Sequence, residues 1–165
     1  YGFINKHISE LGVEAQNSSM NLVTGQDGRQ KFQLKPDLSF KMDGNQWIAD
    51  TKYKLVYTNE KDTKNGISQS DLYQMVAYAI RFKSENIILF YPNNVGSDKL
   101  NSDTLERVDE FSNTTITIHL HQIPIYDEEV LESDLDTGKD LSSIFQNLEG
   151  RLKKALESAL KQTVQ

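Results

Sequence analysis

Apolar and polar positions along the chain change period several times, and each change predicts a new element of structure. Apolar side chains at helical spacing over residues 1–11 predict a short amphipathic helix that ends near Gly12. Alternating positions then predict antiparallel strands joined by turn signals, because Asp-Gly dipeptides favour tight hairpins. The expected strands cover residues 20–24, 30–42 and 46–54, and Pro36 implies a strand start, an edge or a bulge.

The middle of the chain predicts one helix followed by two strands. The helix is expected to begin at Ser68 or Ser70 and to run to about Phe82. Its predicted buried stripe consists of Leu72, Met75, Val76, Ala79 and Ile80. The continuous apolar run 87–91 predicts a strand that is buried on both faces, and residues 115–125 predict another strand. We therefore expect a mixed α/β domain in which the helix crosses over between parallel strands.

The length of 165 residues fits a single domain with a sizeable core. We expect a core over about residues 1–125, an acidic linker over about 126–140, and an amphipathic C-terminal helix over about 141–162. The chain begins with Tyr1 rather than Met, so we expect it to be a fragment of a longer protein.

The composition excludes several chemistries. There are no cysteines, which rules out disulfides, zinc–thiolate sites and thiol catalysis and fits a cytoplasmic location. The apolar runs are too short to cross a bilayer, and the start of the chain has no signal-peptide pattern. A glycine-rich phosphate loop is also missing, so any nucleotide hydrolysis must come from a partner.

The net charge of −6 at first argues against a nucleic-acid partner, but its distribution is uneven. Residues 127–140 hold seven acids and one base, which accounts for all of the net charge. Residues 29–64 hold eight bases against five acids, so a phosphate backbone could dock on the middle of the chain. The ordinary alternative is that these lysines only solubilise the surface.

The residues that carry chemistry are Asp37, Asp50 and Lys52. Asp50 and Lys52 are two residues apart on one predicted strand, so they project from the same face. Asp37 lies on the partner strand of the hairpin, which can bring the two acids together. Carboxylates are the ligands that a hard divalent ion prefers, and a lysine supplies positive charge near a scissile phosphate. This pattern favours a metal-dependent phosphodiesterase, although a solvated surface strand can also carry Asp-x-Lys.

The predicted helix adds a polar face made of Asp71, Gln74, Tyr78 and Arg81. Such a face can line a cleft beside the hairpin. The simpler explanation is that Asp71 complements the helix dipole in the first turn and that the other side chains sit at its rim.

Four sequence blocks, in order, resemble the McrC-type nuclease subunit of methylcytosine-specific restriction systems, of the PD-(D/E)xK superfamily. They are Leu-Lys-Pro-Asp-Leu at 34–38, Ile-Ala-Asp-Thr-Lys-Tyr-Lys at 48–54, Ser-Gln-Ser-Asp-Leu-Tyr-Gln-Met at 68–75 with Ala-Tyr-Ala at 77–79, and Leu-Phe-Tyr-Pro at 89–92. The resemblance implies a restriction-endonuclease-like core, a mixed sheet flanked by helices.

The resemblance also implies roles for single residues. Asp37 and Asp50 are expected to bind Mg²⁺, for which Mn²⁺ substitutes, and Lys52 is expected to orient or activate the attacking water. Gln74 corresponds to a glutamine that supports the site, with Asp71 and Tyr73 in the same block. The family works with a GTP-hydrolysing ring subunit of the AAA+ type, McrB, which recognises modified DNA while the nuclease subunit cuts both strands.

One departure concerns the first helix, where family members often carry a glutamate that helps to hold the metal. Gly2 stands at the aligned place, and Glu10 is the only acid on the helix, about two turns away. Glu10 is therefore a weak candidate, and a second metal is in question.

Other readings stay open. His119 and His121 share a strand face and could bind a metal, but no third ligand is near in sequence, which favours satisfied or exposed histidines. We expect a Mg²⁺-dependent endonuclease acting on double-stranded DNA, with no membrane partner and with dimerisation as one route to double-strand cleavage. The alternatives are an inactive docking module of the same system, or a nuclease of this superfamily that acts alone in repair or defence.

Overall fold

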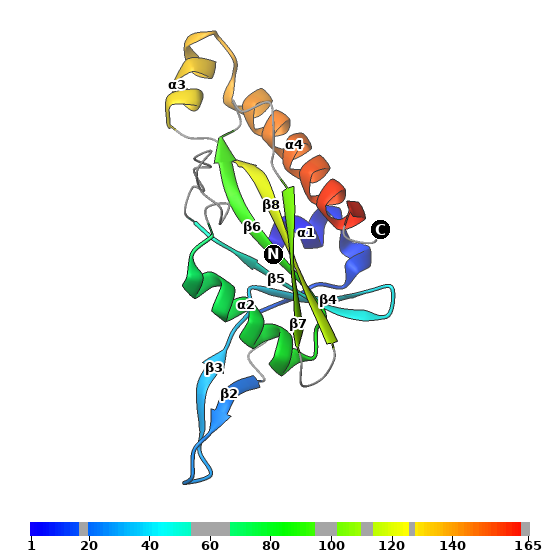
Figure 1. Cartoon of the computed structure of the whole chain (residues 1–165). Helices are drawn as coiled ribbons and strands as arrows, with labels where there is room; N and C mark the ends of the chain where they lie inside the picture. The colour runs from blue at the N-terminus through cyan, green and yellow to red at the C-terminus, as the bar shows by residue number, and fades with distance from the viewer. Residues whose placement is uncertain (17–19, 54–66, 95–101, 110–113, 126–127, 163–165) are drawn as a thin grey trace.

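The computed structural model describes residues 1–16, 20–53, 67–94, 102–109, 114–125 and 128–162 (Figure 1). The helices are α1 (Gly2–His7), the 3₁₀ turn η1 (Ser9–Leu11), α2 (Gln69–Phe82), α3 (Glu128–Asp136) and α4 (Leu141–Gln162). The strands are β1 (Glu14–Ala15), β2 (Met20–Thr24), β3 (Gln30–Leu34), β4 (Leu38–Met42), β5 (Asn45–Thr51), β6 (Asn86–Asn94), β7 (Ser102–Asp109) and β8 (Thr114–Ile125).

Six of these strands form one mixed sheet in the order β1-β4-β5-β6-β8-β7. β4 and β5 form the predicted antiparallel hairpin. β6 then pairs parallel to β5, as the sequence predicts, because α2 carries the chain back across the sheet between them. β8 pairs parallel to β6, and β7 pairs antiparallel to β8 at the edge. The mixed α/β architecture predicted from the sequence is thus confirmed.

Helices cover both faces of the sheet, and each face has its own apolar core. α2 packs through Met75 and Ala79 on one face, whereas α4 packs through Leu156 and Ala159 on the other (Figure 1). β6 serves both cores, because its successive side chains point to opposite faces. Its odd-numbered positions 87, 89 and 91 join the α2 core, and positions 88 and 90 join the α4 core. This explains the unbroken apolar run that predicted a doubly buried strand.

The helix boundaries follow local signals. Ser68 caps α2, and its side chain accepts a hydrogen bond from the backbone N–H of Asp71. The first helix is broken at Ile8 and ends in a 3₁₀ turn that closes at Gly12, which adopts a left-handed conformation (φ 53°). α4 covers the predicted final helix. No helix in the described ranges is long and apolar enough to span a membrane.

The apolar positions of α2 and α4 are not all buried. In α2, Ile80 is exposed, and Tyr78 takes its place in the core together with the carboxylate of Asp71. In α4, Leu141 and Phe145 keep the helical period but remain exposed. The period marks the correct face in each case, but it does not say how far the neighbouring elements extend over that face.

Three elements were not predicted, and one of them is the two-residue strand β1. β7 is an edge strand in a stretch with four charged residues, so it has no apolar run to reveal it. α3 occupies part of the acidic segment that was expected to be a linker, so this segment is helical over residues 128–136. The loop expected at 58–66 lies outside the described residues.

The predicted strand over residues 30–42 is divided in two at Pro36, because proline has no N–H to donate to a sheet hydrogen bond. β4 belongs to the large sheet, whereas β3 pairs with β2 in a separate two-stranded hairpin. Within β3, Phe32 has a left-handed backbone (φ 58°) and is 72% exposed. Its conformation costs about 1 kcal/mol relative to glycine, since the Cβ atom meets the backbone.

Candidate active site

The β4–β5 hairpin brings the two predicted acids together. Leu38 pairs with Ala49, so the antiparallel register, continued by one residue, sets Asp37 opposite Asp50. The backbone at Asp37 is held in turn, because its carbonyl accepts a hydrogen bond from the N–H of Gln16 at 3.0 Å. The two acids therefore approach through sheet geometry, although they are thirteen residues apart along the chain.

Asp37 is fixed by the residue that follows Asp50. The Thr51 backbone N–H and the Thr51 hydroxyl both donate to Asp37 Oδ2, at 2.8 and 2.6 Å. Within the described ranges, Oδ1 of Asp37 has no such donor, so this oxygen is available to a ligand. Thr51 was not singled out from the sequence, and its role follows only from its position opposite the residues that precede β4.

Asp50 is buried and pairs with Lys52. The Lys52 ammonium lies 2.5 Å from Asp50 Oδ2, and both side chains are largely withdrawn from solvent. The Lys52 backbone N–H donates to the carbonyl of Phe90 at 2.9 Å, which extends the pairing of β5 with β6 by one residue. As predicted, Asp50 and Lys52 share one face, the face that α2 covers.

The site holds opposed electrostatic effects. Burial raises the pKa of the Asp50 carboxyl above its ordinary value, and the nearby Asp37 carboxylate adds to this. The hydrogen bond and the charge of Lys52 act in the opposite direction and lower the pKa of Asp50. A buried carboxylate beside a second acid is stabilised by an added cation, so the position favours binding of positive charge.

A chain of hydrogen bonds connects this pair to α2. Lys52 Nζ donates to Gln74 Oε1 at 2.7 Å, and Gln74 Nε2 donates to the Tyr78 hydroxyl at 2.9 Å. The Tyr78 hydroxyl donates to the Lys35 carbonyl at 3.0 Å, just before Asp37. Burial raises the pKa of Tyr78 to about 12, so the phenol keeps its proton at neutral pH. Gln74, predicted to support the site, therefore contacts Lys52 directly.

Tyr78 was placed on the polar helix face by the sequence pattern, but no role in the site was assigned to it. The i, i+4 spacing from Gln74 is a usable signal, because such residues are neighbours on a helix. Its bond to the Lys35 carbonyl has no local signal, since the two residues are far apart in sequence.

The remaining candidates have other surroundings. Asp71 is buried near the start of α2, where its Oδ2 accepts a hydrogen bond from Tyr91 at 3.4 Å. Tyr73 is 62% exposed and accepts a hydrogen bond from Gln69. Glu10 is exposed on η1, next to helix α1, which packs in the core on the opposite sheet face from Asp50.

A divalent metal fits the donor set in a limited way. Asp37 and Asp50 supply carboxylate oxygens, and in the described part of the chain no group of three or more acidic, histidine or cysteine side chains is placed to hold a metal ion. Mg²⁺ is commonly held by one or two carboxylates and keeps several waters, so two acids suffice for one such ion. The chemistry of the site therefore fits a single, partly hydrated divalent ion.

The two strand histidines lie on the other face of the sheet. His119 stacks on Trp47 with ring centroids 5.5 Å apart, and His121 lies 6.3 Å from the ring of Phe90. Both are buried, and neither Nε2 atom has a hydrogen-bond partner within the described residues. The histidines are thus packed aromatic groups, neither exposed nor satisfied by a hydrogen bond at Nε2.

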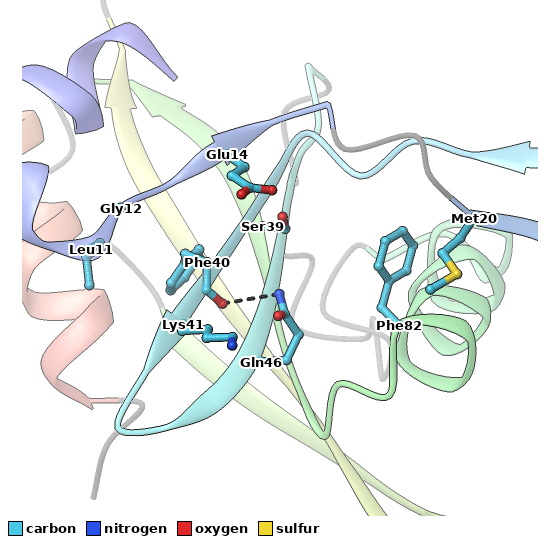
Figure 2. A pocket seen from close by; sticks show the side chains of 9 residues that line it. All are labelled: Leu11, Gly12, Glu14, Met20, Ser39, Phe40, Lys41, Gln46 and Phe82. Atoms are coloured by element: carbon cyan, nitrogen blue, oxygen red, sulfur yellow. Dashed lines mark hydrogen bonds between the residues drawn. The ribbon is translucent and has the colours of Figure 1, made fainter.

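A separate cavity of about 390 Å³ shares no residue with the two acids (Figure 2). It lies where the β4–β5 hairpin approaches the base of β2 and the end of α2. Met20 and Phe82 lie on one side of it, and Gln46 bonds the Phe40 carbonyl at 3.2 Å near its centre. Its lining mixes one acid, one base, two uncharged polar side chains and apolar groups, which specifies no ligand class.

The fold and the paired acids together define a mixed α/β protein with a carboxylate–lysine site at the end of a parallel strand pair. A family described as "McrBC 5-methylcytosine restriction system component" matches residues 3–92, which is more than half of the chain. The chain therefore belongs to this family. The matched region contains Asp37, Asp50, Lys52 and Gln74.

Comparison with solved structures agrees with this fold. A chain from the refined half-complex of a tetradecameric assembly of Thermococcus gammatolerans McrB AAA+ hexamers with bound McrC superposes with a TM-score of 0.53 at 12% identity. The match covers 94% of the present chain and 30% of that chain, so the present chain spans under a third of its length. No curated protein matches the sequence.

Proposed function

We propose that this chain is the metal-dependent endonuclease domain of an McrC-type restriction subunit, and that it cleaves phosphodiester bonds of double-stranded DNA. The observation that carries the proposal is the convergence of Asp37, Asp50 and Lys52 at one end of the β4–β5 hairpin, with Gln74 holding the lysine. Membership of the McrBC family supports it. In this proposal, the site would correspond to the PD-(D/E)xK arrangement that the sequence resembles.

Each side chain of the site has its own role in the proposed reaction. Asp37 and Asp50 would hold Mg²⁺, with Mn²⁺ as a substitute, and the ion would supply Lewis-acid chemistry that activates water and neutralises phosphate charge. The Lys52 ammonium would leave its pair with Asp50 and stabilise negative charge on the phosphate. Gln74 and Tyr78 position that ammonium through their hydrogen bonds.

We further propose that the nuclease acts with an AAA+ partner subunit that hydrolyses GTP. The similar chain comes from an assembly described as McrB AAA+ hexamers with bound McrC. Recognition of modified DNA would then belong to the partner, whereas this chain would contact the DNA backbone. Cleavage of both strands would require two such sites.

The test is cleavage of supercoiled plasmid in Mg²⁺ or Mn²⁺, with and without the partner subunit and GTP. Asp50→Asn and Lys52→Ala should abolish nicking. Their matched controls are Asp43→Asn and Lys154→Ala, which make the same chemical changes at exposed positions. If Asp50→Asn cuts as fast as Asp43→Asn, the site assignment is wrong.

A second candidate, a docking module without catalytic activity, is favoured by one observation. Leu135, Leu141 and Phe145 are exposed apolar residues on α3 and α4. This surface is compatible with an active nuclease as well, so plasmid cleavage decides between the two. A nuclease of the same superfamily that acts alone would cut without the partner subunit.

A further inference from the structure

The hairpin formed by β2 and β3, here called the arm (residues 20–34), projects away from the main sheet below α2 (Figure 1). Its base is anchored: Leu34 is buried in the α2 core, and Met20 lies beside Phe82 (Figure 2). Toward its tip the apolar side chains become exposed, at 45% for Val23 and 72% for Phe32. The base of the arm is therefore held by packing, whereas the side chains toward its tip contribute little to the core.

The arm is positively charged although the chain as a whole is negative. Arg29, Lys31 and Lys35, the residue that follows the arm, face only one acid over this stretch, Asp27, in a chain of net charge −6. Lys31 and Asp27 form a loose, exposed pair at 3.8 Å, and the Asp27 carboxylate also accepts a hydrogen bond from the Arg29 backbone. The exposed surface here is thus positive, as a phosphate ligand requires.

Phe32 lies in the sequence between these positively charged residues, and its backbone conformation is unfavourable for phenylalanine. Its backbone is left-handed (φ 58°), which glycine tolerates and phenylalanine does not, and its ring is mostly in solvent. Neither burial nor backbone preference explains a phenylalanine at this position. A contact outside the chain would explain it, and an aromatic side chain between positively charged side chains is a common arrangement in nucleic-acid binding surfaces.

The arm is also coupled to the candidate active site. The chain leaves β3 at Leu34, and the next carbonyl, that of Lys35, receives the Tyr78 hydrogen bond at 3.0 Å. Asp37 follows two residues later. Strands of five residues reach about 17 Å, which corresponds to roughly five base pairs along a duplex. The arm is therefore anchored beside the site and is long enough to follow a bound duplex for half a helical turn.

We propose that the arm contacts the DNA duplex beside the cleavage position. Arg29, Lys31 and Lys35 bind backbone phosphates, and Phe32 packs against sugars or base edges. This inference rests on the proposed function, because it takes duplex DNA as the substrate. The positive charge of the arm favours DNA over the surface of a protein partner.

The experiment is fluorescence anisotropy of a short labelled duplex without divalent metal, so that binding is measured apart from cleavage. The double variant Arg29→Gln with Lys31→Gln should weaken binding about tenfold and reduce the slope of log K against log salt by about two. Phe32→Ala should weaken binding about fivefold and leave that slope unchanged, since its contact is not ionic. The control, Lys41→Gln with Lys154→Gln, removes the same charge from exposed positions off the arm and should bind as the wild type does.

If both arm variants bind the duplex as tightly as the control, or if the wild type does not bind it, the proposal is overturned. If the arm variants keep their DNA affinity and lose affinity for the AAA+ subunit instead, the arm is a protein-docking element and the proposal is likewise overturned. Loss of DNA binding in the arm variants supports the proposal even if the wild type fails to cut in Mg²⁺, a result that would count against the nuclease function alone.

Discussion

The two faces of the six-stranded sheet differ in whether their buried polar groups are hydrogen-bonded. On the α2 face, Lys52, Gln74 and Tyr78 form a continuous chain of hydrogen bonds that ends at a backbone carbonyl. On the α4 face, Trp47 Nε1 and the Nε2 atoms of His119 and His121 are buried without a partner in the described residues.

From this difference, we expect the polar groups of the α2 face to serve function and those of the α4 face to serve packing. A satisfied polar network fixes the geometry of its members, whereas unpaired polar atoms in an apolar layer only reduce stability. Changes on the α2 face that keep the remaining polar groups hydrogen-bonded should therefore alter cleavage and leave stability nearly unchanged. Changes on the α4 face should alter stability and leave cleavage nearly unchanged.

The largest effect is expected for Asp50→Asn on the α2 face. Plasmid cleavage should fall about a thousandfold or more, which corresponds to roughly 4 kcal/mol of transition-state stabilisation. The thermal midpoint should change little, because burial already disfavours the charged form of Asp50. If Asp50→Asn unfolded the domain and Asp43→Asn did not, Asp50 would be a structural residue and the comparison of the two faces would fail.

The α4 face should govern acid stability. Burial, together with the charge of His121, lowers the pKa of His119 from 6.5 to about 4. The unfolded chain therefore binds a proton that the folded chain does not, and stability should fall as the pH drops from about 6.5 toward 4. The loss is on the order of 3 kcal/mol.

Urea unfolding at pH 7 and pH 5 measures this dependence. His119→Phe keeps a ring against Trp47 and cannot be protonated, so it should flatten the dependence. His119→Leu likewise cannot be protonated and should also flatten the pH dependence, without introducing the larger phenylalanine ring. A dependence as steep in both variants as in the wild type would show that His119 is not responsible.

Smaller changes on the α2 face should test positioning. Gln74→Leu removes the hydrogen bond to Lys52 and should lower kcat about tenfold with little change in KM. Tyr78→Phe should have a weaker effect, because it acts one bond farther away. Gln69→Leu on the same helix is the control. A rise in KM with unchanged kcat would assign Gln74 to substrate binding instead.

The smallest effect concerns the arm, outside both faces. Phe32→Gly relieves the left-handed backbone and should stabilise the folded state by roughly 1 kcal/mol relative to Phe32→Ala. Denaturant unfolding of the two variants provides the measurement. Equal stability would mean that Phe32 carries no backbone strain.

Much of this arrangement could be predicted because it depends on local signals. The turn at residues 43–45 and the alternation around it place Asp37 opposite Asp50, and Ser68 marks the start of α2. The order β5, α2, β6 also fixes the parallel pairing, since the connection is long enough for a crossover.

The rest depends on long-range packing. β7 has no apolar run, because an edge strand has a neighbouring strand on one side only. Ile80 and Tyr78 exchange roles according to what lies over α2, and the Tyr78–Lys35 hydrogen bond joins residues that are distant in sequence. Helical period and turn residues contain none of this information.

The central claim is that Asp37 and Asp50 together hold a divalent ion. Mn²⁺ binding, followed by electron paramagnetic resonance and calorimetry, tests it without relying on activity. We predict one tightly held ion per chain, lost in Asp37→Asn and in Asp50→Asn and retained in Asp43→Asn. Undiminished Mn²⁺ binding in Asp50→Asn would contradict the account.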